Sequence, residues 1–217
     1  MIRACIFDLD GVIVDTAIYH FVAWKNLAAS LGIEFTEKNN EKLKGVGRME
    51  SLDFILSLGQ VQKDESEMLV LAHNKNEHYK SLISSLTEEA ILPGIKVFFD
   101  ELKEAGVFIA LGSSSKNARP VLENIGLKSY FDVIVDGTNI SRSKPDPEVF
   151  ELGAQALEIP PVEIIVFEDA QAGIDAAKTG GFKCVGVGSA EELSGADILI
   201  PGFEGLTYAH LLNQLKQ

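Results

Sequence analysis

Two carboxylates stand close together near the start of the chain, at Asp8 and Asp10, and Gly11 follows them. They come directly after residues 4–7, a short apolar run typical of a buried strand. Carboxylates at the carboxyl end of a strand can act as a nucleophile, as a general acid or base, or as ligands of a hard cation. Because an Asp-x-Asp pair is also common in turns, its meaning depends on which other groups reach the same place.

Three further polar groups follow later strand-like runs. The first is a cluster of hydroxyl, amine and amide groups that opens a helical pattern, formed by Ser113, Ser114, Ser115, Lys116 and Asn117. Free N–H groups at the start of a helix favour a phosphate. The second is Lys144, in a loop stiffened by prolines, and the third is the acidic pair Glu168 and Asp169. Oxygen ligands from Asp8 and this pair are of the kind that Mg²⁺ prefers.

The elements that must bring these groups together alternate along the chain. From residue 94 onward, segments with helical periodicity separate the strand-like runs. This alternation predicts an α/β fold, a Rossmann-like parallel sheet covered by helices. Because the carboxyl ends of parallel strands meet at one edge, the four polar groups are expected to converge there. The expected strands are residues 4–7, 107–111, 133–135, 164–167, 183–187 and 197–200.

The stretch between the first two expected strands is too long for a single crossover, and its apolar pattern is helical throughout. We therefore expect an inserted helical cap domain at residues 15–87 and an α/β core domain made of residues 1–14 and 88–217. Residues 44–48 of the cap combine two glycines with two cations, a composition suited to a loop that approaches an anion. The two crossings between core and cap are expected to act as hinges of a lid over the sheet edge.

The composition excludes several classes of protein. The 217 residues are 46% hydrophobic and 24% charged, which indicates a globular chain and not a disordered one. The net charge of −13 does not attract nucleic acid or anionic lipid, so an anionic substrate needs local cations or a metal. Cys5 and Cys184 lie in separate apolar runs, as buried reduced thiols do, and no apolar segment is long enough for a signal peptide or a membrane span. A cytoplasmic protein is expected.

The ordered set of acidic pair, serine, lysine and second acidic pair resembles the haloacid dehalogenase superfamily of phosphotransferases along the whole chain. This resemblance implies that Asp8 is the nucleophile and that Asp10 is the general acid and base. It also implies that Ser113 and Lys144 hold the transferred phosphoryl group. The ligands implied for Mg²⁺ are Asp8, Asp10, Glu168 and Asp169.

Within that superfamily the chain is most similar to the β-phosphoglucomutases, through residues 7–13, 15–16, 19–21, 23–25, 43–46 with Arg48, Ser113 with 115–117, and Asp169 with 171–174. The resemblance implies that His20 hydrogen-bonds toward Asp10 and so links cap closure to proton transfer. Gly47 departs from the pattern, which has serine there, and is expected to loosen the loop that presents Arg48. The substrate-binding residues implied are Thr16, His20, Trp24, Lys44, Gly45, Arg48, Ser51, Lys75, Ser113, Ser114, Ser115, Lys116, Asn117 and Lys144.

The activity implied by the resemblance is an isomerase reaction between β-D-glucose 1-phosphate and D-glucose 6-phosphate, through phosphorylated Asp8 and a 1,6-bisphosphate. It further implies a monomer that glucose 1,6-bisphosphate activates. A second polar set, at Arg48 and residues 115–117, favours this mutase because a phosphatase needs only one phosphate site. The alternative is a sugar-phosphate phosphatase of the same superfamily, in which water reaches phosphorylated Asp8. A third possibility, a phosphate-binding module without catalysis, does not account for the nucleophile, the acid and base, and the metal carboxylates together.

Overall fold

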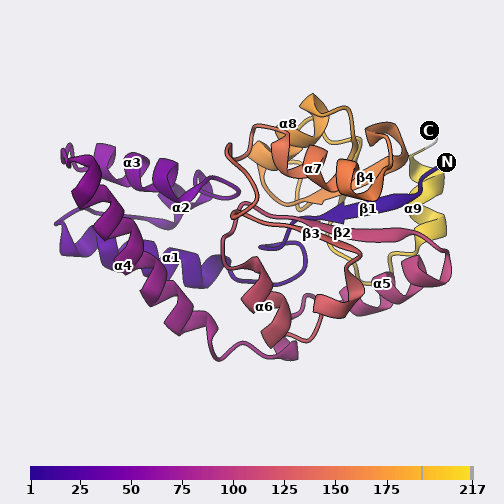
Figure 1. Cartoon of the computed structure of the whole chain (residues 1–217), viewed down its shortest axis with the longest axis horizontal. Coiled ribbons are helices and arrows are strands. Elements are labelled where there is room, and N and C mark those ends of the chain that lie inside the picture. The colour runs from indigo at the N-terminus through magenta and orange to yellow at the C-terminus, as the bar shows by residue number, and fades with distance from the viewer. Residues whose placement is uncertain (192, 216–217) are drawn as a thin grey trace.

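A parallel β-sheet forms the centre of the molecule in a computed structural model that describes residues 1–191 and 193–215. Its strand order is β3-β2-β1-β4-β5-β6, and all pairings in it are parallel (Figure 1). The α/β fold predicted from the sequence is confirmed. The strands are β1 (Ala4–Phe7), β2 (Phe108–Gly112), β3 (Val133–Val135), β4 (Ile164–Glu168), β5 (Lys183–Val187) and β6 (Ile198–Ile200).

Helices cover both faces of this sheet, which explains the unbroken apolar runs of its central strands. Cys5 and Phe7 of β1 belong to one hydrophobic cluster, with α5, α6 and α9. Ala4 and Ile6 belong to a second cluster on the opposite face, with α7 and α8. The helices of the core are α5 (Ile95–Glu104), α6 (Ala118–Asn124), α7 (Glu148–Leu157), α8 (Gln171–Thr179) and α9 (Tyr208–Gln214), with short 3₁₀ turns at η1 (Glu88–Ala90), η2 (Lys128–Tyr130) and η3 (Pro161–Glu163).

The order of the strands reverses at β1, which lies between β2 and β4. Residues Ala4 to Phe7 pair with β2 on one side and with β4 on the other, so Phe7 lies opposite both Leu111 and Phe167. The loops that leave β1, β2 and β4 therefore start side by side. Such a switch point at the carboxyl edge is where open α/β sheets bind their ligands.

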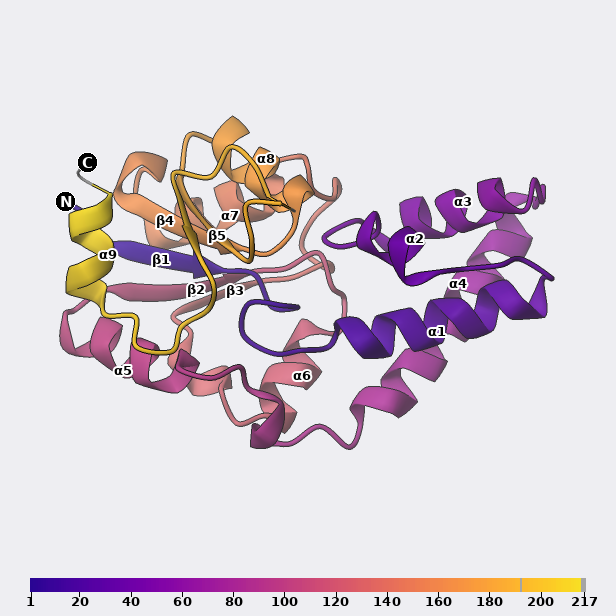
Figure 2. The same cartoon turned by 180° about the vertical axis from the view of Figure 1, so that it is seen from behind.

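Four helices follow β1 and project beyond this carboxyl edge, as Figures 1 and 2 show from opposite sides. They are α1 (Ala17–Ser30), α2 (Glu37–Glu41), α3 (Arg48–Leu58) and α4 (Glu65–Ile83). A hydrophobic cluster of their own, which includes Trp24, Phe35 and Leu52, holds them together. All four lie within residues 15–87, the segment expected to form the cap. In the described part of the chain, no helix is both long enough and apolar enough to cross a bilayer.

Candidate active site

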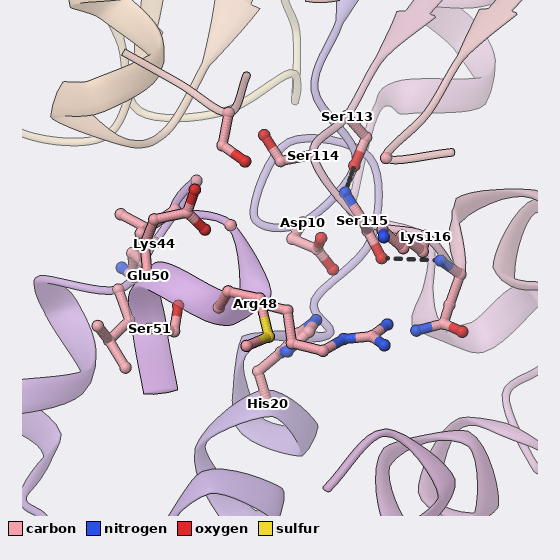
Figure 3. Close-up of a pocket in the computed structure, with 18 of the residues that line it drawn as sticks. Asp10, His20, Lys44, Arg48, Glu50, Ser51, Ser113, Ser114, Ser115 and Lys116 are labelled. Atoms are coloured by element: carbon pink, nitrogen blue, oxygen red, sulfur yellow. Dashed lines mark hydrogen bonds between the residues drawn. The ribbon is translucent and has the colours of Figure 1, made fainter. Parts of the chain in front are cut away.

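A cavity of about 270 Å³ lies between the carboxyl edge of the sheet and helices α1, α3 and α4. Core residues reach it from the loops after β1, β2, β3 and β4, and cap residues face them (Figure 3). Thr16, Lys144 and Glu168 are buried and do not line the cavity. The predicted residues that do line it are Asp8, Asp10, His20, Trp24, Lys44, Gly45, Arg48, Ser51, Lys75, Ser113, Ser114, Ser115, Lys116, Asn117 and Asp169.

A buried ion-pair network joins the ends of β1 and β4 to the loop after β3. The Nζ atom of Lys144 donates to Oδ1 of Asp8 at 2.6 Å and also to Oε1 of Glu168. Burial alone lowers the pKa of Lys144, but the two carboxylates outweigh it and hold this pKa above its usual value. Burial raises the pKa of Glu168 to about 7, against the charge of Lys144. Lys144 therefore remains a cation in direct contact with Asp8.

Three carboxyl groups at this edge can hold a metal ion. Oxygen atoms of Asp8, Glu168 and Asp169 all lie within 4.8 Å of one another. Burial, followed by the charges of Glu168 and Asp8, raises the pKa of Asp169 well above its usual value, so keeping all three carboxyl groups ionised is costly and a bound cation would offset that cost. Hard oxygen donors in this number fit Mg²⁺, which completes its shell with water and substrate oxygens. The Asp10 side chain, also expected as a ligand, lies outside this group.

Gly11 allows the acidic group to form. Its φ of +79° lies in the left-handed region that favours glycine, and a Cβ at this position would stand 2.1 Å from Oδ2 of Asp169. The loop that carries Asp10 turns back here, with the Gly11 amide bonded to the carbonyl of Val14 at 2.9 Å. A side chain at position 11 would therefore push the loops after β1 and β4 apart.

Asp10 has the environment of a carboxyl group that exchanges a proton near neutral pH. Burial, followed by the charge of Asp8, raises the pKa of Asp10 to about 7. Its Oδ1 atom is buried without a hydrogen-bond partner among the residues that the structure describes. In Figure 3 its side chain points into the cavity between Arg48 and Ser115. A carboxyl group with these properties can act as a general acid and base toward a bound hydroxyl.

His20 pairs with a lysine and not with Asp10. Its Nδ1 atom lies 3.0 Å from Nζ of Lys75, and no hydrogen bond joins His20 to Asp10, although both side chains are described. The Lys75 amine lies over the ring of Trp24, 4.3 Å from its centre, and the ring of His20 packs 4.0 Å from that of Tyr79. Burial, followed by the charges of Lys75 and Arg48, lowers the pKa of His20 well below its usual value, so the imidazole is neutral.

Replacing Lys75 with methionine is expected to stabilise the ligand-free protein more at pH 7 than at pH 9. Burial, followed by the charge of Arg48, lowers the pKa of Lys75 from 10.5 to about 7. Above pH 7 the folded protein has released a proton that the unfolded chain still holds, so the cost of burying this amine falls as pH rises. The decrease is at most about 1.4 kcal/mol per pH unit up to the unfolded pKa. Urea denaturation at the two pH values measures the difference.

The matched control is Lys80→Met, at an exposed position of the same helix. Its stability relative to the parent protein should change little between pH 7 and pH 9. A gain from Lys75→Met that is equal at both pH values would contradict a lowered pKa for Lys75.

A second polar set lines the same cavity. The backbone N–H of Asn117 donates to Oγ of Ser115 at 3.2 Å, and the backbone N–H of Ser115 donates to Oγ of Ser113 at 3.1 Å (Figure 3). Lys116 and Asn117, at the end of this chain of turns, line the same cavity as Arg48 of α3. The Ser114 hydroxyl also lines the cavity and has no hydrogen-bond partner among the described residues. The polar lining residues that the sequence did not predict are Asn40, Glu50, Asn76, Ser141 and Ser143.

Gly47 is where the cap loop meets a core loop. A Cβ at this position would stand 2.3 Å from Oε2 of Glu50 and 2.3 Å from Oγ of Ser143. The missing side chain lets Gly47 pack between these two groups, and the looser loop expected from the sequence stays a prediction.

Replacing Gly47 with serine is expected to change the free energy of unfolding by no more than about 0.5 kcal/mol. Gly47 has a φ of −65° and precedes the first residue of α3, so serine fits its backbone and can cap the helix. The Glu50 and Ser143 atoms in its way are ends of rotatable side chains. Urea denaturation measures the change, with Gly59→Ser as a comparison, because a Cβ there would stand 2.5 Å from Ile33 in the cap core. A loss above about 1 kcal/mol at position 47 would mean that the two loops cannot separate.

Comparison with known proteins identifies the family. The family model "haloacid dehalogenase-like hydrolase" matches residues 2–181. The chain is 42% identical to a β-phosphoglucomutase of Bacillus subtilis over 217 residues, which cover 99% of this chain and 96% of that protein. It is also 32% identical to a phosphorylated carbohydrates phosphatase of Thermotoga maritima over 83% of this chain and 82% of the relative.

Solved structures agree with these matches. The crystal structure of β-phosphoglucomutase from Clostridium difficile superposes with a TM-score of 0.96 at 42% identity, covering 100% of this chain and 98% of that one. CbbY from Rhodobacter sphaeroides, in complex with xylulose 1,5-bisphosphate, superposes with a TM-score of 0.82 at 26% identity, covering 97% and 99%. The resemblance inferred from the motifs is confirmed, and the chain belongs to the haloacid dehalogenase-like hydrolase family.

Proposed function

We propose that this chain is a β-phosphoglucomutase, which interconverts β-D-glucose 1-phosphate and D-glucose 6-phosphate. The observation that carries the proposal is that one cavity is lined by two sets of polar groups suited to phosphate. One lies around Asp8 and Ser113, and the other around Arg48 and Asn117. A molecule with phosphates at both ends can turn around between two such sets. The 42% identity to a β-phosphoglucomutase over nearly the whole chain supports the same reaction.

In this proposal Asp8 is the nucleophile that carries the phosphoryl group. A carboxylate is a weak nucleophile, so catalysis depends on positioning and on neutralising the charge of the phosphoryl oxygens. Lys144 supplies a fixed positive charge 2.6 Å from Asp8, and burial keeps water from screening it. A bound Mg²⁺, held by Asp8, Glu168 and Asp169, would add further positive charge at the same place. The Ser113 hydroxyl lines the cavity beside them and is placed to donate to a phosphoryl oxygen.

Asp10 is proposed as the general acid and base. With a pKa of about 7 it can accept the proton of the sugar hydroxyl that attacks phosphorylated Asp8, and return a proton in the reverse half of the cycle. A positioned group of this kind contributes typically 10²–10⁴-fold to the rate.

The remaining parts of the proposal concern organisation. We propose a core domain of residues 1–14 and 88–217 and a cap domain of residues 15–87, with the substrate bound between them. We also propose a monomer that β-glucose 1,6-bisphosphate activates by phosphorylating Asp8. A cytoplasmic location fits the two buried free thiols, Cys5 and Cys184, because a reducing compartment keeps thiols unpaired.

A sugar-phosphate phosphatase is the second candidate. Relatives named as phosphatases share 32% identity with the chain, including one from Thermotoga maritima and a fructose-1-phosphate phosphatase from Escherichia coli. Both candidates use phosphorylated Asp8 and differ in the acceptor, which is a sugar hydroxyl in the mutase and water in the phosphatase. The buried position of Asp8 under the cap favours the mutase, because it limits the access of water.

The deciding experiment is a coupled assay of glucose 6-phosphate formed from β-D-glucose 1-phosphate, with Mg²⁺ and a catalytic amount of β-glucose 1,6-bisphosphate. Free phosphate is measured in the same tube. Glucose 6-phosphate with little free phosphate supports the mutase. Release of free phosphate without glucose 6-phosphate would contradict the mutase and support the phosphatase.

A further inference from the structure

Asn76 of α4 lies where the cap meets the core in the second polar set. Its Oδ1 atom accepts two hydrogen bonds, from Nη2 of Arg48 at 2.7 Å and from Nδ2 of Asn117 at 2.9 Å. Arg48 begins α3 of the cap, and Asn117 precedes α6 of the core. One amide oxygen therefore accepts a hydrogen bond from a cap residue and another from a core residue.

The orientation of the Asn76 amide follows from the chemistry of its partners. A guanidinium has only N–H donors, so the atom of Asn76 that faces Arg48 must be the oxygen. The same oxygen then requires Asn117 to present its NH₂ group. Both side chains are thereby held in place, and the other N–H groups of the guanidinium and the second N–H of the Asn117 amide remain available to donate to a phosphate oxygen.

The neutrality of Asn76 preserves the charge of Arg48. The carboxylate that acts electrostatically on Arg48 is Glu77, which is exposed and already paired with Lys80 at 2.9 Å. Among the described residues, no carboxylate forms an ion pair with Arg48, whose guanidinium donates a hydrogen bond to the amide oxygen of Asn76. An amide oxygen orients a guanidinium without cancelling its charge, whereas a carboxylate would do both.

We propose that Asn76 is a positioning residue for the distal phosphate of the sugar substrate, because it holds Arg48 of the cap and Asn117 of the core together. This inference rests on the mutase proposed above. It assigns to Asn76 the task of forming the distal phosphate site at the same time as the cap and core come together. Asn76 does not contact the reacting atoms, so its effect is on substrate affinity and not on the chemical step.

The test compares Asn76→Ala with Asn76→Asp in the steady-state assay. The alanine variant loses the shared acceptor, and its KM for β-D-glucose 1-phosphate should rise about tenfold with kcat within about threefold. The aspartate variant keeps the acceptor geometry and pairs with Arg48, but it neutralises the guanidinium and repels phosphate. Its KM should therefore rise more, on the order of 100-fold.

Which of the two variants has the higher KM distinguishes this positioning role from a purely structural one. If Asn76 only stabilised the fold, aspartate would be the milder change, because it still accepts both hydrogen bonds and gains an ion pair. Asn74→Ala and Asn74→Asp, at an exposed position of the same helix, control for changes in helix propensity and surface charge. Their KM values should equal that of the parent enzyme, and thermal melts establish that all variants are folded.

A second readout uses acetyl phosphate, which carries a single phosphate and therefore does not need to bind at the distal phosphate site. Its rate of phosphorylation of Asp8, followed by intact-mass spectrometry, should be unchanged in both Asn76 variants. The proposal is overturned if Asn76→Asp has the lower KM of the two, if both KM values lie within twofold of the parent, or if acetyl phosphate reacts more slowly. If the parent enzyme releases only free phosphate, the mutase is wrong, and KM for hydrolysis still tests Asn76.

Discussion

Replacing Asp8 with asparagine should abolish turnover, with a loss on the order of 10⁶-fold, as expected when a covalent nucleophile is removed. Asparagine has the same shape, and its amide oxygen can still accept from Lys144, which donates to Asp8 Oδ1 at 2.6 Å. The fold should therefore survive while the nucleophilic carboxylate is gone. The measurements are the coupled assay and the mass of the protein after treatment with acetyl phosphate, which should show no phosphoryl adduct.

Asp53→Asn is the matched control, because Asp53 is exposed on α3 and away from the cavity lining. It should retain full activity and form the adduct. Substantial turnover by Asp8→Asn would contradict both the mutase and the phosphatase, since each requires phosphorylated Asp8. An adduct on that variant would place the phosphoryl group on another residue.

Replacing Lys144 with methionine should destabilise the metal-free protein by about 3–5 kcal/mol at pH 8 and should remove most of the activity. Lys144 is the cation bonded to the carboxylates of Asp8 and Glu168, and all three side chains are buried. Methionine fills the space but leaves the two negative charges without their partner. Urea denaturation at pH 8 and pH 5.5 measures the loss.

The loss should be smaller at pH 5.5, and the sign follows from the direction of the pKa shift. Burial raises the pKa of Glu168 to about 7 even with Lys144 present, and removing the cation raises it further. An acid whose pKa is higher in the folded state destabilises that state as pH rises above its unfolded pKa, so protonation at pH 5.5 relieves the variant. Lys38→Met, at an exposed position of α2, should show no such dependence. An equal loss at both pH values for Lys144→Met would mean that the carboxyl groups are already neutral.

The α/β core and the convergence of its polar groups follow from the pattern of residues along the chain. Asp8 and Glu168 are 160 positions apart, yet each comes directly after a short apolar run, whereas Lys144 lies in a loop nine residues after the run at 133–135. Parallel strands have their carboxyl ends at one edge, so any group that directly follows such a strand must arrive there. The pattern of apolar residues predicts where the strands lie. Whatever the order of those strands in the sheet, groups at their carboxyl ends lie at the same edge.

The cap contacts could be predicted only in part. The cations of residues 44–48 were recognised from the composition of their loop, but Asn76 was missed because an asparagine in a polar helix has no distinctive local pattern. Lys75 was predicted as a substrate-binding residue, whereas the structure adds its bond to His20 and its place over Trp24. The contacts of Asn76 and of Lys75 depend on how α4 packs on α3 and α1. They join residues that are more than 25 positions apart in the chain.

Tertiary structure alone decided the electrostatic properties of the site. The sequence names two aspartates at positions 8 and 10, and nothing in it separates their environments. In the folded chain Asp8 contacts Lys144 and joins the acidic group, whereas Asp10 lies outside that group with a pKa raised to about 7. A pKa depends on burial and on charges within a few ångströms, and both arise only when strands, loops and cap pack together. The sequence therefore determined which groups meet, and packing determined the protonation state and hydrogen-bond partner of each.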